Sequence, residues 1–409
     1  MPVAPSSTGH LRLLRSPGVP GVVLPSVLAR LPVGMTTVLL VLLVQQRTGS
    51  YRVAGLAVAL NSLAFAAVSP WYGRLADRGH AALVIAAAGV LQVPAMAGLL
   101  LSAGSGSSAW AVVLWAAAVG GASPPVAAIT RALWPRLLDD TRLHPVAYNL
   151  EAVLVDLLYV LGPLLAGLAY ATAGAAAGLA VASGAVLVGS IGLACSPAIR
   201  GYKQQPGPAP TGHVLAEPAL RSLLAACALL SVAYVMLEVL IPAFAVEHHA
   251  PAAGGLLVAV WAVASVLGGM AYMRRDWRSA LTRRLVVLVA ANAGGFAALA
   301  LAHGVWQLAV LLCLGGVLMA PATSVEYELV GRLTQAGRAT EAFAWFGTAA
   351  YGAGGIGGVL AGVLVRPLGT DGAFLVPGAF ALLAVVPAWW LHRMPHGAEH
   401  RPASADGER

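Results

Sequence analysis

The sequence contains isolated charged side chains inside long apolar runs, and these residues have the clearest chemical potential. Glu238 lies in the segment Val235-Met-Leu-Glu-Val-Leu-Ile-Pro242, and no other charge occurs between Arg221 and Glu247. A carboxylate in apolar surroundings is costly when it is ionised, which favours uptake of a proton. Glu238 is therefore a candidate proton carrier. The alternative is a structural, hydrogen-bonded carboxyl group nearer to a polar interface.

Arg30 and Asp156 form a second candidate set for proton coupling. Arg30 falls about two turns into the first apolar segment, and Asp156 falls about two turns into the fifth. Each must find water or a partner, because an unpaired charge is expensive there. Since their depths are similar, we expect them to pair, with Glu151 about one turn shallower. Such a pair is a structural staple, a site for an anionic substrate, or a proton-linked switch.

The elements that position these residues are membrane helices. Hydrophobic residues make up 59% of the chain and charged residues only 10%, with a mean hydropathy of +0.81. A soluble domain has about 25% charged residues. The sequence therefore predicts an all-α integral membrane protein. Apolar runs and loop residues give twelve transmembrane helices, at 21–45, 53–73, 81–103, 109–131, 149–171, 174–197, 220–246, 253–273, 284–303, 305–327, 341–365 and 373–392.

The net charge of +8 is explained by membrane topology, because the basic residues gather on one face of the predicted membrane domain. We therefore expect no nucleic-acid partner. Of the 24 Lys and Arg residues, all but four fall on one face of the predicted membrane domain. Arg47, Arg52 and Arg366 fall on the other face, and Arg30 lies within a helix. This positive-inside pattern predicts a multi-pass protein of the plasma membrane with both termini in the cytoplasm.

The predicted helices divide into two halves. The Pro- and Gly-rich segment Arg200–His213 is the longest polar stretch between the termini, so it reads as a linker. The expected organisation is a cytoplasmic N-terminal tail, a six-helix half, a cytoplasmic linker, a second six-helix half and a cytoplasmic C-terminal tail. These regions span 1–20, 21–198, 199–219, 220–392 and 393–409, respectively.

The two halves also repeat. Glu151 is followed by Gly162 and Gly167, and the same E-x10-G-x4-G spacing begins at Glu341, 190 residues later. Pro124-Pro125 in the fourth helix has a weaker counterpart in the tenth. Two pseudo-symmetric halves related along the membrane normal place a substrate site between them, near the midplane.

The hairpin Gly73-Arg-Leu-Ala-Asp77-Arg78 carries a family resemblance. It resembles the signature loop of the major facilitator superfamily, Gly-x-x-x-Asp-Arg-x-Gly followed by basic residues. Gly73, Asp77 and Arg78 match, whereas the later glycine and basic residues are absent. The resemblance implies a cytoplasmic gate in which Asp77 and Arg78 meet the other half. Gly73, Glu151 and the Glu341 end of the eleventh helix complete this expected gate.

Other stretches resemble an actinobacterial-type group of facilitators mostly assigned to efflux. They include Leu28-Ala-Arg-Leu-Pro-Val-Gly-Met35 and Thr340-Glu-Ala-Phe-Ala-Trp345. The segment Gly162-Pro163-Leu-Leu-Ala-Gly167 partly matches a motif of drug/proton antiporters. That motif implies a helix that bends and packs closely against the other half. An ordinary proline kink is the alternative interpretation.

These observations predict a secondary transporter of a small organic molecule, working by alternating access as proton-coupled efflux. A multidrug antiporter is the expected type, functioning as a monomer in the lipid bilayer with protons as the coupling ion. The alternatives are a proton-coupled or facilitated importer of a metabolite, and a non-transporting scaffold or receptor. The motifs of metalloproteases, serine hydrolases and phosphate-binding loops are missing, so we expect no enzyme. No cofactor and no metal site are expected.

Overall fold

The computed structural model describes residues 8–104, 108–202, 213–250, 253–275, 277, 279–335 and 337–394. Regular secondary structure in these ranges is helical. The N-terminal half contains α1 (Thr8–Arg15), α2 (Val19–Arg30), α3 (Pro32–Thr48), α4 (Tyr51–Leu75), α5 (Ala81–Gly104), α6 (Ala109–Gly121), α7 (Val126–Leu137), α8 (His144–Cys195) and α9 (Pro197–Arg200). The C-terminal half contains α10 (Pro218–Glu247), α11 (Ala253–Met273), α12 (Leu281–Ala298), α13 (Val305–Gly316), α14 (Met319–Leu333), α15 (Ala339–Ala373) and α16 (Leu375–Arg393).

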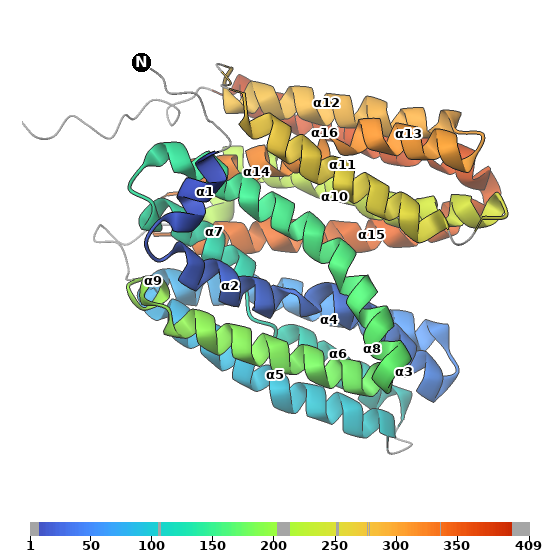
Figure 1. Cartoon of the computed structure of the whole chain (residues 1–409), viewed down its shortest axis with the longest axis horizontal. Helices are drawn as coiled ribbons and strands as arrows, with labels where there is room; N and C mark the ends of the chain where they lie inside the picture. Colours follow the sequence, from blue (N-terminus) through green and yellow to red (C-terminus); the bar gives the residue numbers. More distant parts are fainter. Residues whose placement is uncertain are drawn as a thin grey trace, which may run out of the picture.

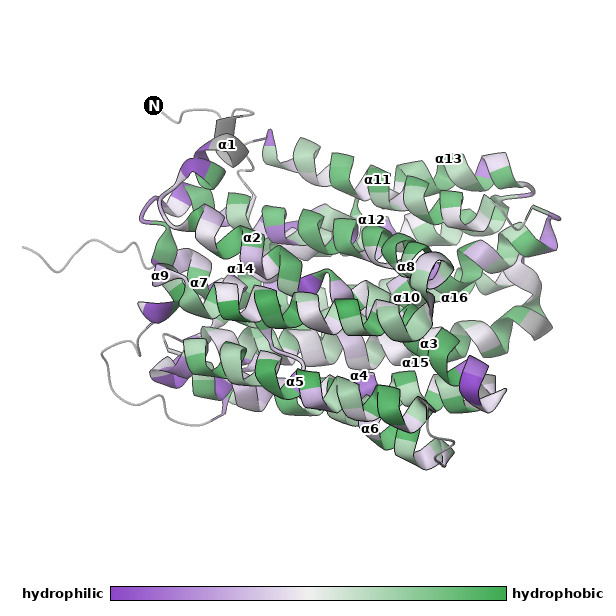
Figure 2. Ribbon diagram, turned by 60° about the horizontal axis from the view of Figure 1, so that its bottom comes forward, coloured by the Kyte–Doolittle hydropathy of each residue, from purple (hydrophilic) through white to green (hydrophobic). Residues whose placement is uncertain are grey.

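The helices form because their long apolar runs satisfy backbone hydrogen bonds internally, as a lipid environment requires. Hydrophobic residues cover the lengths of the helices, while polar residues collect at their ends and at a few internal positions (Figure 2). Many large apolar side chains point outward, including Leu24, Leu63, Val181, Leu256 and Val386. A soluble protein rarely exposes apolar surface so extensively, so this surface faces lipid.

Twelve membrane crossings account for the apolar helices. Ten spans in the described residues are long and apolar enough to cross a membrane. Two of them, Val53–Ala103 with 51 residues and Thr141–Cys195 with 55, each fold back on themselves. The turns occur at Gly79 (φ 90°) and Gly174 (φ 84°), in backbone conformations that suit glycine. Eight single spans and two doubled ones give twelve crossings, as the sequence predicts.

Three crossings that the sequence predicts as continuous helices are broken in the structure. The first crossing breaks between α2 and α3 at Pro32, and the fourth breaks between α6 and α7 at Pro124-Pro125. The tenth breaks between α13 and α14, just before Pro321. Proline lacks an amide hydrogen, so it is tolerated in the first turn of a helix but interrupts an interior.

The twelve crossings form two halves that lie side by side (Figure 1). Within the N-terminal half α8 packs on α2, α3 and α5, and within the C-terminal half α10 packs on α15 and α16. The halves meet where α4 and α7 contact α15 and where α8 contacts α11 and α14. Residues 203–212 of the predicted linker lie outside the described residues, as does the predicted C-terminal tail after residue 394. The predicted N-terminal tail contains the helix α1.

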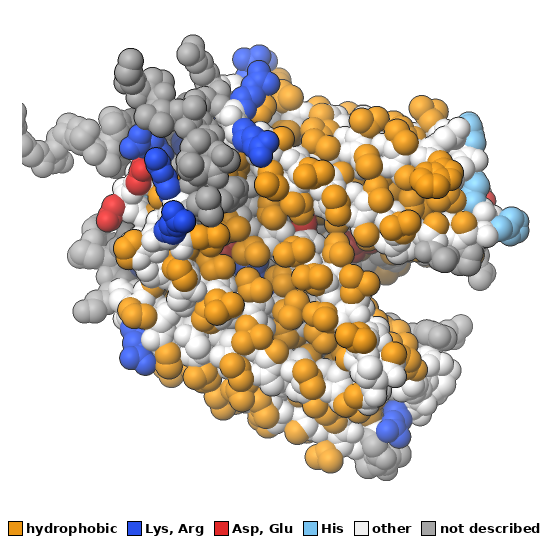
Figure 3. All heavy atoms as spheres, in the orientation of Figure 1, with side chains coloured by type: hydrophobic (Ala, Val, Ile, Leu, Met, Phe, Trp, Pro, Cys, Tyr) orange, Lys and Arg blue, Asp and Glu red, His pale blue; other side chains and the backbone are white. Residues whose placement is uncertain are grey.

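The two ends of the molecule differ in charge. We call the end that carries α1, α9 and the turn between α4 and α5 the basic end (Figures 1 and 3). Its exposed or partly exposed arginines include Arg74, Arg78, Arg136, Arg142, Arg200, Arg221, Arg275, Arg283, Arg332 and Arg393. The opposite end carries Arg47 and the histidines 248, 249 and 303.

Candidate functional site

At the basic end, Asp77 of the N-terminal half supplies the missing cap of a helix in the C-terminal half. Its two carboxylate oxygens accept hydrogen bonds from the backbone amides of Thr340, at 3.1 Å, and Glu341, at 2.9 Å. These amides lie in the first turn of α15, where no helical partner exists for them. A carboxylate is well placed there, because it also meets the positive end of the helix dipole. Asp77 therefore fastens the two halves together.

Gly73 and Arg74 complete this contact. A Cβ atom on Gly73 would lie 2.8 Å from the Cα atom of Glu341, so only glycine allows α4 and α15 to approach so closely. Arg74 Nε donates to Glu341 Oε1 at 2.7 Å. Arg78, which the sequence places in the gate, is exposed, and the cation that bridges the halves here is Arg74.

Tyr202, just after α9, is a third component of the gate and was not anticipated from the sequence. Its hydroxyl donates to Asp77 Oδ1 at 3.1 Å and lies 2.7 Å from Thr340 Oγ1. The Arg136 guanidinium stacks on its ring at 4.0 Å. Burial raises the pKa of the Tyr202 phenol, and the negative charge of Asp77 adds to this effect. The phenol therefore stays neutral and available as a donor.

A buried ion cluster lies behind the gate. Glu151 Oε2 accepts a hydrogen bond from Arg30 Nη1 at 2.8 Å, and Arg131 Nε lies 3.7 Å from the same oxygen. All three side chains are buried. The expected pairing of Arg30 with Asp156 is therefore wrong. Glu151, which the sequence places about one turn shallower than Asp156, is the carboxylate that faces Arg30 of α2.

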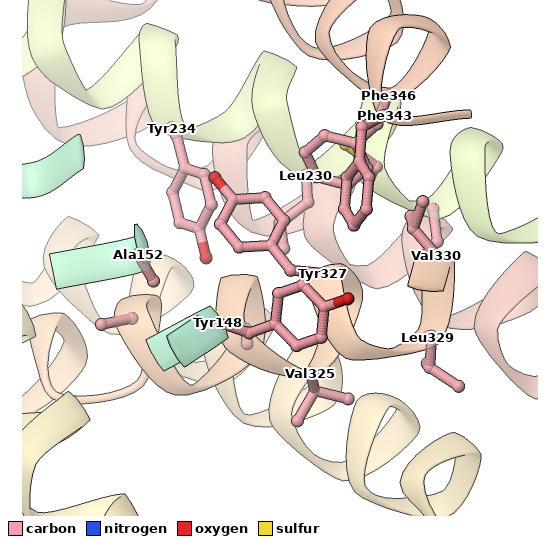
Figure 4. Close-up of a cluster of buried hydrophobic side chains, with 14 of the residues drawn as sticks. Tyr148, Ala152, Leu230, Tyr234, Val325, Tyr327, Leu329, Val330, Phe343 and Phe346 are labelled. Carbon is pink, nitrogen blue, oxygen red and sulfur yellow. The ribbon is translucent and has the colours of Figure 1, made fainter. Parts of the chain in front are cut away.

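Arg131 also reaches the C-terminal half. Its Nη2 donates to the Tyr327 hydroxyl at 2.8 Å, and its guanidinium lies 3.9 Å from the centre of the Tyr327 ring. Tyr327 continues into a buried aromatic cluster with Phe343, Phe346 and Tyr148, the last from α8 (Figure 4). This cluster fills the space between the halves and, with the gate, closes the basic end.

Asp156 lies at a further polar contact between the halves. Ser265 Oγ on α11 donates to Asp156 Oδ2 at 2.6 Å, and the Ala320 amide at the start of α14 donates to Ser265 at 3.0 Å. Asp156 has no ion pair with any described residue. The Tyr234 hydroxyl is within electrostatic reach of both Asp156 and Glu326. Tyr234 and Glu326 Oε1 are buried and find no hydrogen-bond partner among the described residues.

Glu238 lies on α10, near α8 of the other half. Its side chain is partly exposed, and it lies within electrostatic reach of Tyr159 on α8. Tyr159 is also within electrostatic reach of Tyr351 on α15. The Tyr351 ring meets the Phe65 ring of α4, with the ring centroids 5.8 Å apart. Within the described part of the chain, Glu238 makes no ion pair. The structure thus places the Glu238 carboxyl group near Tyr159 of the other half.

The two halves part at the end opposite the gate. A wedge-shaped gap separates the two halves there in the space-filling view (Figure 3). The polar contacts that join the halves gather toward the basic end, from Thr348, which donates to the Ala66 carbonyl at 2.8 Å, to Asp77 at the gate. The structure is therefore closed at the basic end and open at the other.

The antiporter motif implied that the Gly162-Pro163 segment packs against the other half. In the structure Gly162 instead packs within its own half. A Cβ atom on Gly162 would lie 2.7 Å from the Cα atom of Gly34 on α3. Gly167 has no neighbour within 4 Å. The helix continues through Pro163.

Several residues of the site were missed from the sequence. Tyr202, Ser265 and Tyr234 carry common polar groups in apolar segments, and no local pattern marks them. Arg131 is a charged residue within a helix and could have been found by the same criterion that identified Arg30. Glu326 is recognisable in the sequence as a gate or interface residue at the cytoplasmic end of the tenth helix. No group of three or more His, Cys, Asp or Glu side chains suited to a metal ion occurs in the described ranges.

Two six-helix halves, closed against each other at one end and parted at the other, define a membrane transporter. A sequence profile of the Major Facilitator Superfamily matches residues 23–294 and 277–409. The chain belongs to this family and is a transporter, not an enzyme. No curated protein matches the sequence significantly.

Solved structures share the fold at low sequence identity. A bacterial homologue of the iron transporter ferroportin in an outward-facing state matches with a TM-score of 0.74 and 17% identity, covering 92% of this chain and 99% of that chain. The human organic anion transporter MFSD10 (TETRAN) matches with a TM-score of 0.69 and 16% identity, covering 91% of this chain and 100% of that chain. The E.coli Fucose:proton symporter FucP matches with a TM-score of 0.70 and 14% identity, covering 92% of this chain and 99% of that chain. At these identities the similarity concerns the fold alone.

Proposed function

We propose that this protein exports a small organic molecule across the plasma membrane by alternating access, in exchange for protons. The observation that carries the proposal is Glu238, a partly exposed carboxyl group within electrostatic reach of Tyr159 on the other half, with no basic partner among the described residues. A carboxyl group in such a place can accept a proton from the open side and release it after the halves rearrange. The partial match to the drug/proton antiporter motif supports the outward direction.

The proposed orientation follows from charge. With the basic end in the cytoplasm, as the positive-inside rule requires, the open space faces outward. Protons then reach Glu238 from outside, and closure around the carboxyl group delivers them inward while substrate leaves. Asp156 is the second proposed proton site, because it lies between the halves with only a serine as its described hydrogen-bond donor. Arg30, which pairs with Glu151, has a structural role in this scheme.

The surroundings of Glu238 also suggest the substrate class. Tyr159, Tyr351 and Phe65 present aromatic surfaces from both halves, and the carboxyl group adds negative charge when it is ionised. Aromatic faces and a carboxylate together favour an apolar organic cation. Competition between proton and cation for the same carboxylate would couple the two movements directly.

The first test is expression in an efflux-deficient bacterium, with tolerance measured against a panel of antibiotics and cationic dyes. Tolerance should rise for lipophilic cations, and Glu238→Gln should lose this gain at equal membrane levels. Glu217→Gln is the matched control, since Glu217 is an exposed carboxylate outside the helices. Full export by Glu238→Gln at every external pH would refute the role of this residue. Accumulation of the dyes instead of their loss would reverse the proposed direction.

A further inference from the structure

A pocket at the basic end of the C-terminal half lies outside the transport pathway. It lies where α11 ends and α12 begins, and three arginines line it, namely Arg275, Arg283 and Arg284. Between residues 274 and 284 the sequence has five arginines and one aspartate, a net charge of +4. The pocket therefore attracts anions, and nothing in the gate or around Glu238 uses it.

The frame of this pocket is fixed by its own bonds. The Tyr272 and Trp277 rings stack at 4.9 Å, and the Trp277 indole donates to the Tyr272 carbonyl at 2.9 Å. Arg284 donates to the Tyr272 hydroxyl at 2.8 Å and to the Ser279 carbonyl at 3.1 Å. Arg275 lies over the Trp277 ring at 5.0 Å. Arg284 thus has a structural role, whereas Arg283 is exposed and has no hydrogen bond or ion pair within the described residues.

The other wall of the pocket is apolar and continues onto the lipid-facing surface. Val287 and Leu288 line it, and Val287 is 59% exposed. Leu267 and Met270, on the neighbouring α11, are also exposed. Arginines gather at this end of the molecule, toward the left of the view and next to the apolar surface of the helices (Figure 3). The pocket therefore spans the boundary at which lipid headgroups meet acyl chains.

We propose that this pocket binds the headgroup of an anionic phospholipid, with the phosphate held by Arg275 and Arg283 and the upper acyl chain along Val287. Guanidinium groups bind phosphate through paired hydrogen bonds. Basic pockets between helices on the positive side of a membrane are suited to anionic headgroups. A free phosphate ion would make the same arginine contacts but would gain nothing from the apolar wall, which is why a lipid is the better occupant.

The proposal can be tested by fluorescence quenching in reconstituted vesicles. The full chain is placed in phosphatidylcholine vesicles that contain an equal fraction of either brominated phosphatidylglycerol or brominated phosphatidylcholine, with bromine on the upper acyl chain. The part of the emission lost in Trp277→Phe is the signal from Trp277. Brominated phosphatidylglycerol should quench this signal more than brominated phosphatidylcholine. Inorganic phosphate at ~10 mM, far above the concentration of protein sites, should leave this difference unchanged.

The double variant Arg275→Gln/Arg283→Gln should weaken the preference for phosphatidylglycerol by about 10- to 30-fold. Both arginines are exposed, so the fold should survive. The matched control Arg15→Gln/Arg221→Gln removes the same charge from the same end, outside the pocket, and should keep the preference. Equal quenching by the two lipids, an equal loss in the control, or displacement by inorganic phosphate would each overturn the assignment to a phospholipid.

Discussion

Asp77 accepts a hydrogen bond from the backbone amide of Glu341, 264 residues away in the sequence, at 2.9 Å. The cap of α15 is thus supplied by the opposite half of the molecule. This cap must break when the halves separate at the basic end. It therefore stabilises only the conformation that is closed there, and it can hold the gate shut.

Loss of this cap should loosen the gate. Asp77→Ala removes an interaction of about 0.5–2 kcal/mol, which corresponds to a shift of about 2- to 30-fold toward opening of the basic end. Labelling of a cysteine introduced at the buried Ala342, in a chain without Cys195, Cys227 and Cys313, should accelerate by this factor. Arg78→Ala removes an exposed charge next to the latch and should leave the labelling rate unchanged. Equal rates in Asp77→Ala and the parent would show that the cap does not hold the gate.

The close approach at Gly73 should be equally sensitive to size. Gly73→Leu places side-chain atoms where the backbone of α15 lies, since even a Cβ atom would be 2.8 Å from Glu341 Cα. Contacts this short force the helices apart, so the same Ala342 reporter should label faster. Gly55→Leu is the control on the same helix, because Gly55 has no neighbour within 4 Å. Slow labelling in Gly73→Leu would mean that the gate closes in another geometry.

The buried cluster around Glu151 predicts unequal effects from its members. Glu151→Gln leaves both Arg30 and Arg131 without a carboxylate, whereas Arg30→Met leaves Glu151 still 3.7 Å from Arg131. Breaking a buried ion pair costs about 3–5 kcal/mol. The apparent Tm in detergent should therefore fall further in Glu151→Gln than in Arg30→Met.

Asp156 serves as the control for that cluster. It bonds to Ser265 and not to Arg30, so the effects of Asp156→Asn and Arg30→Met on stability should add, to within about 0.5 kcal/mol. A double variant that is clearly more stable than this sum would restore the pairing of Arg30 with Asp156.

The fold was largely predictable because it depends on apolar length and loop composition. Twelve crossings, two halves and the family followed from runs of about 20 apolar residues and from the Gly73–Arg78 hairpin. The breaks inside the first, fourth and tenth crossings were missed, since hydropathy does not register a short interruption of hydrogen bonding at Pro32 or before Pro321.

The site was predictable only where a charge was conspicuous. Glu238, Asp156, Arg30 and Glu151 stand out in apolar segments, but hydropathy cannot tell which of two nearby carboxylates faces Arg30. That choice depends on the rotation of α8 about its axis. Tyr202 contacts Asp77 across 125 residues of chain, and such a long-range contact leaves no mark in the local sequence.

The two glycines that flank Pro163 on α8 should differ sharply in their tolerance of a side chain. Gly162 faces Gly34 of α3, and a Cβ atom would lie 2.7 Å from the Gly34 Cα atom, while Gly167 has open surroundings. Gly162→Ala should lower the apparent Tm, because close packing of small residues is a main source of helix association in membranes. Gly167→Ala should leave the Tm unchanged or raise it, since alanine favours helix by about 1 kcal/mol. Equal Tm values in the two variants would mean that α8 does not pack on α3 through Gly162. That result would favour the alternative in which this segment packs against the other half.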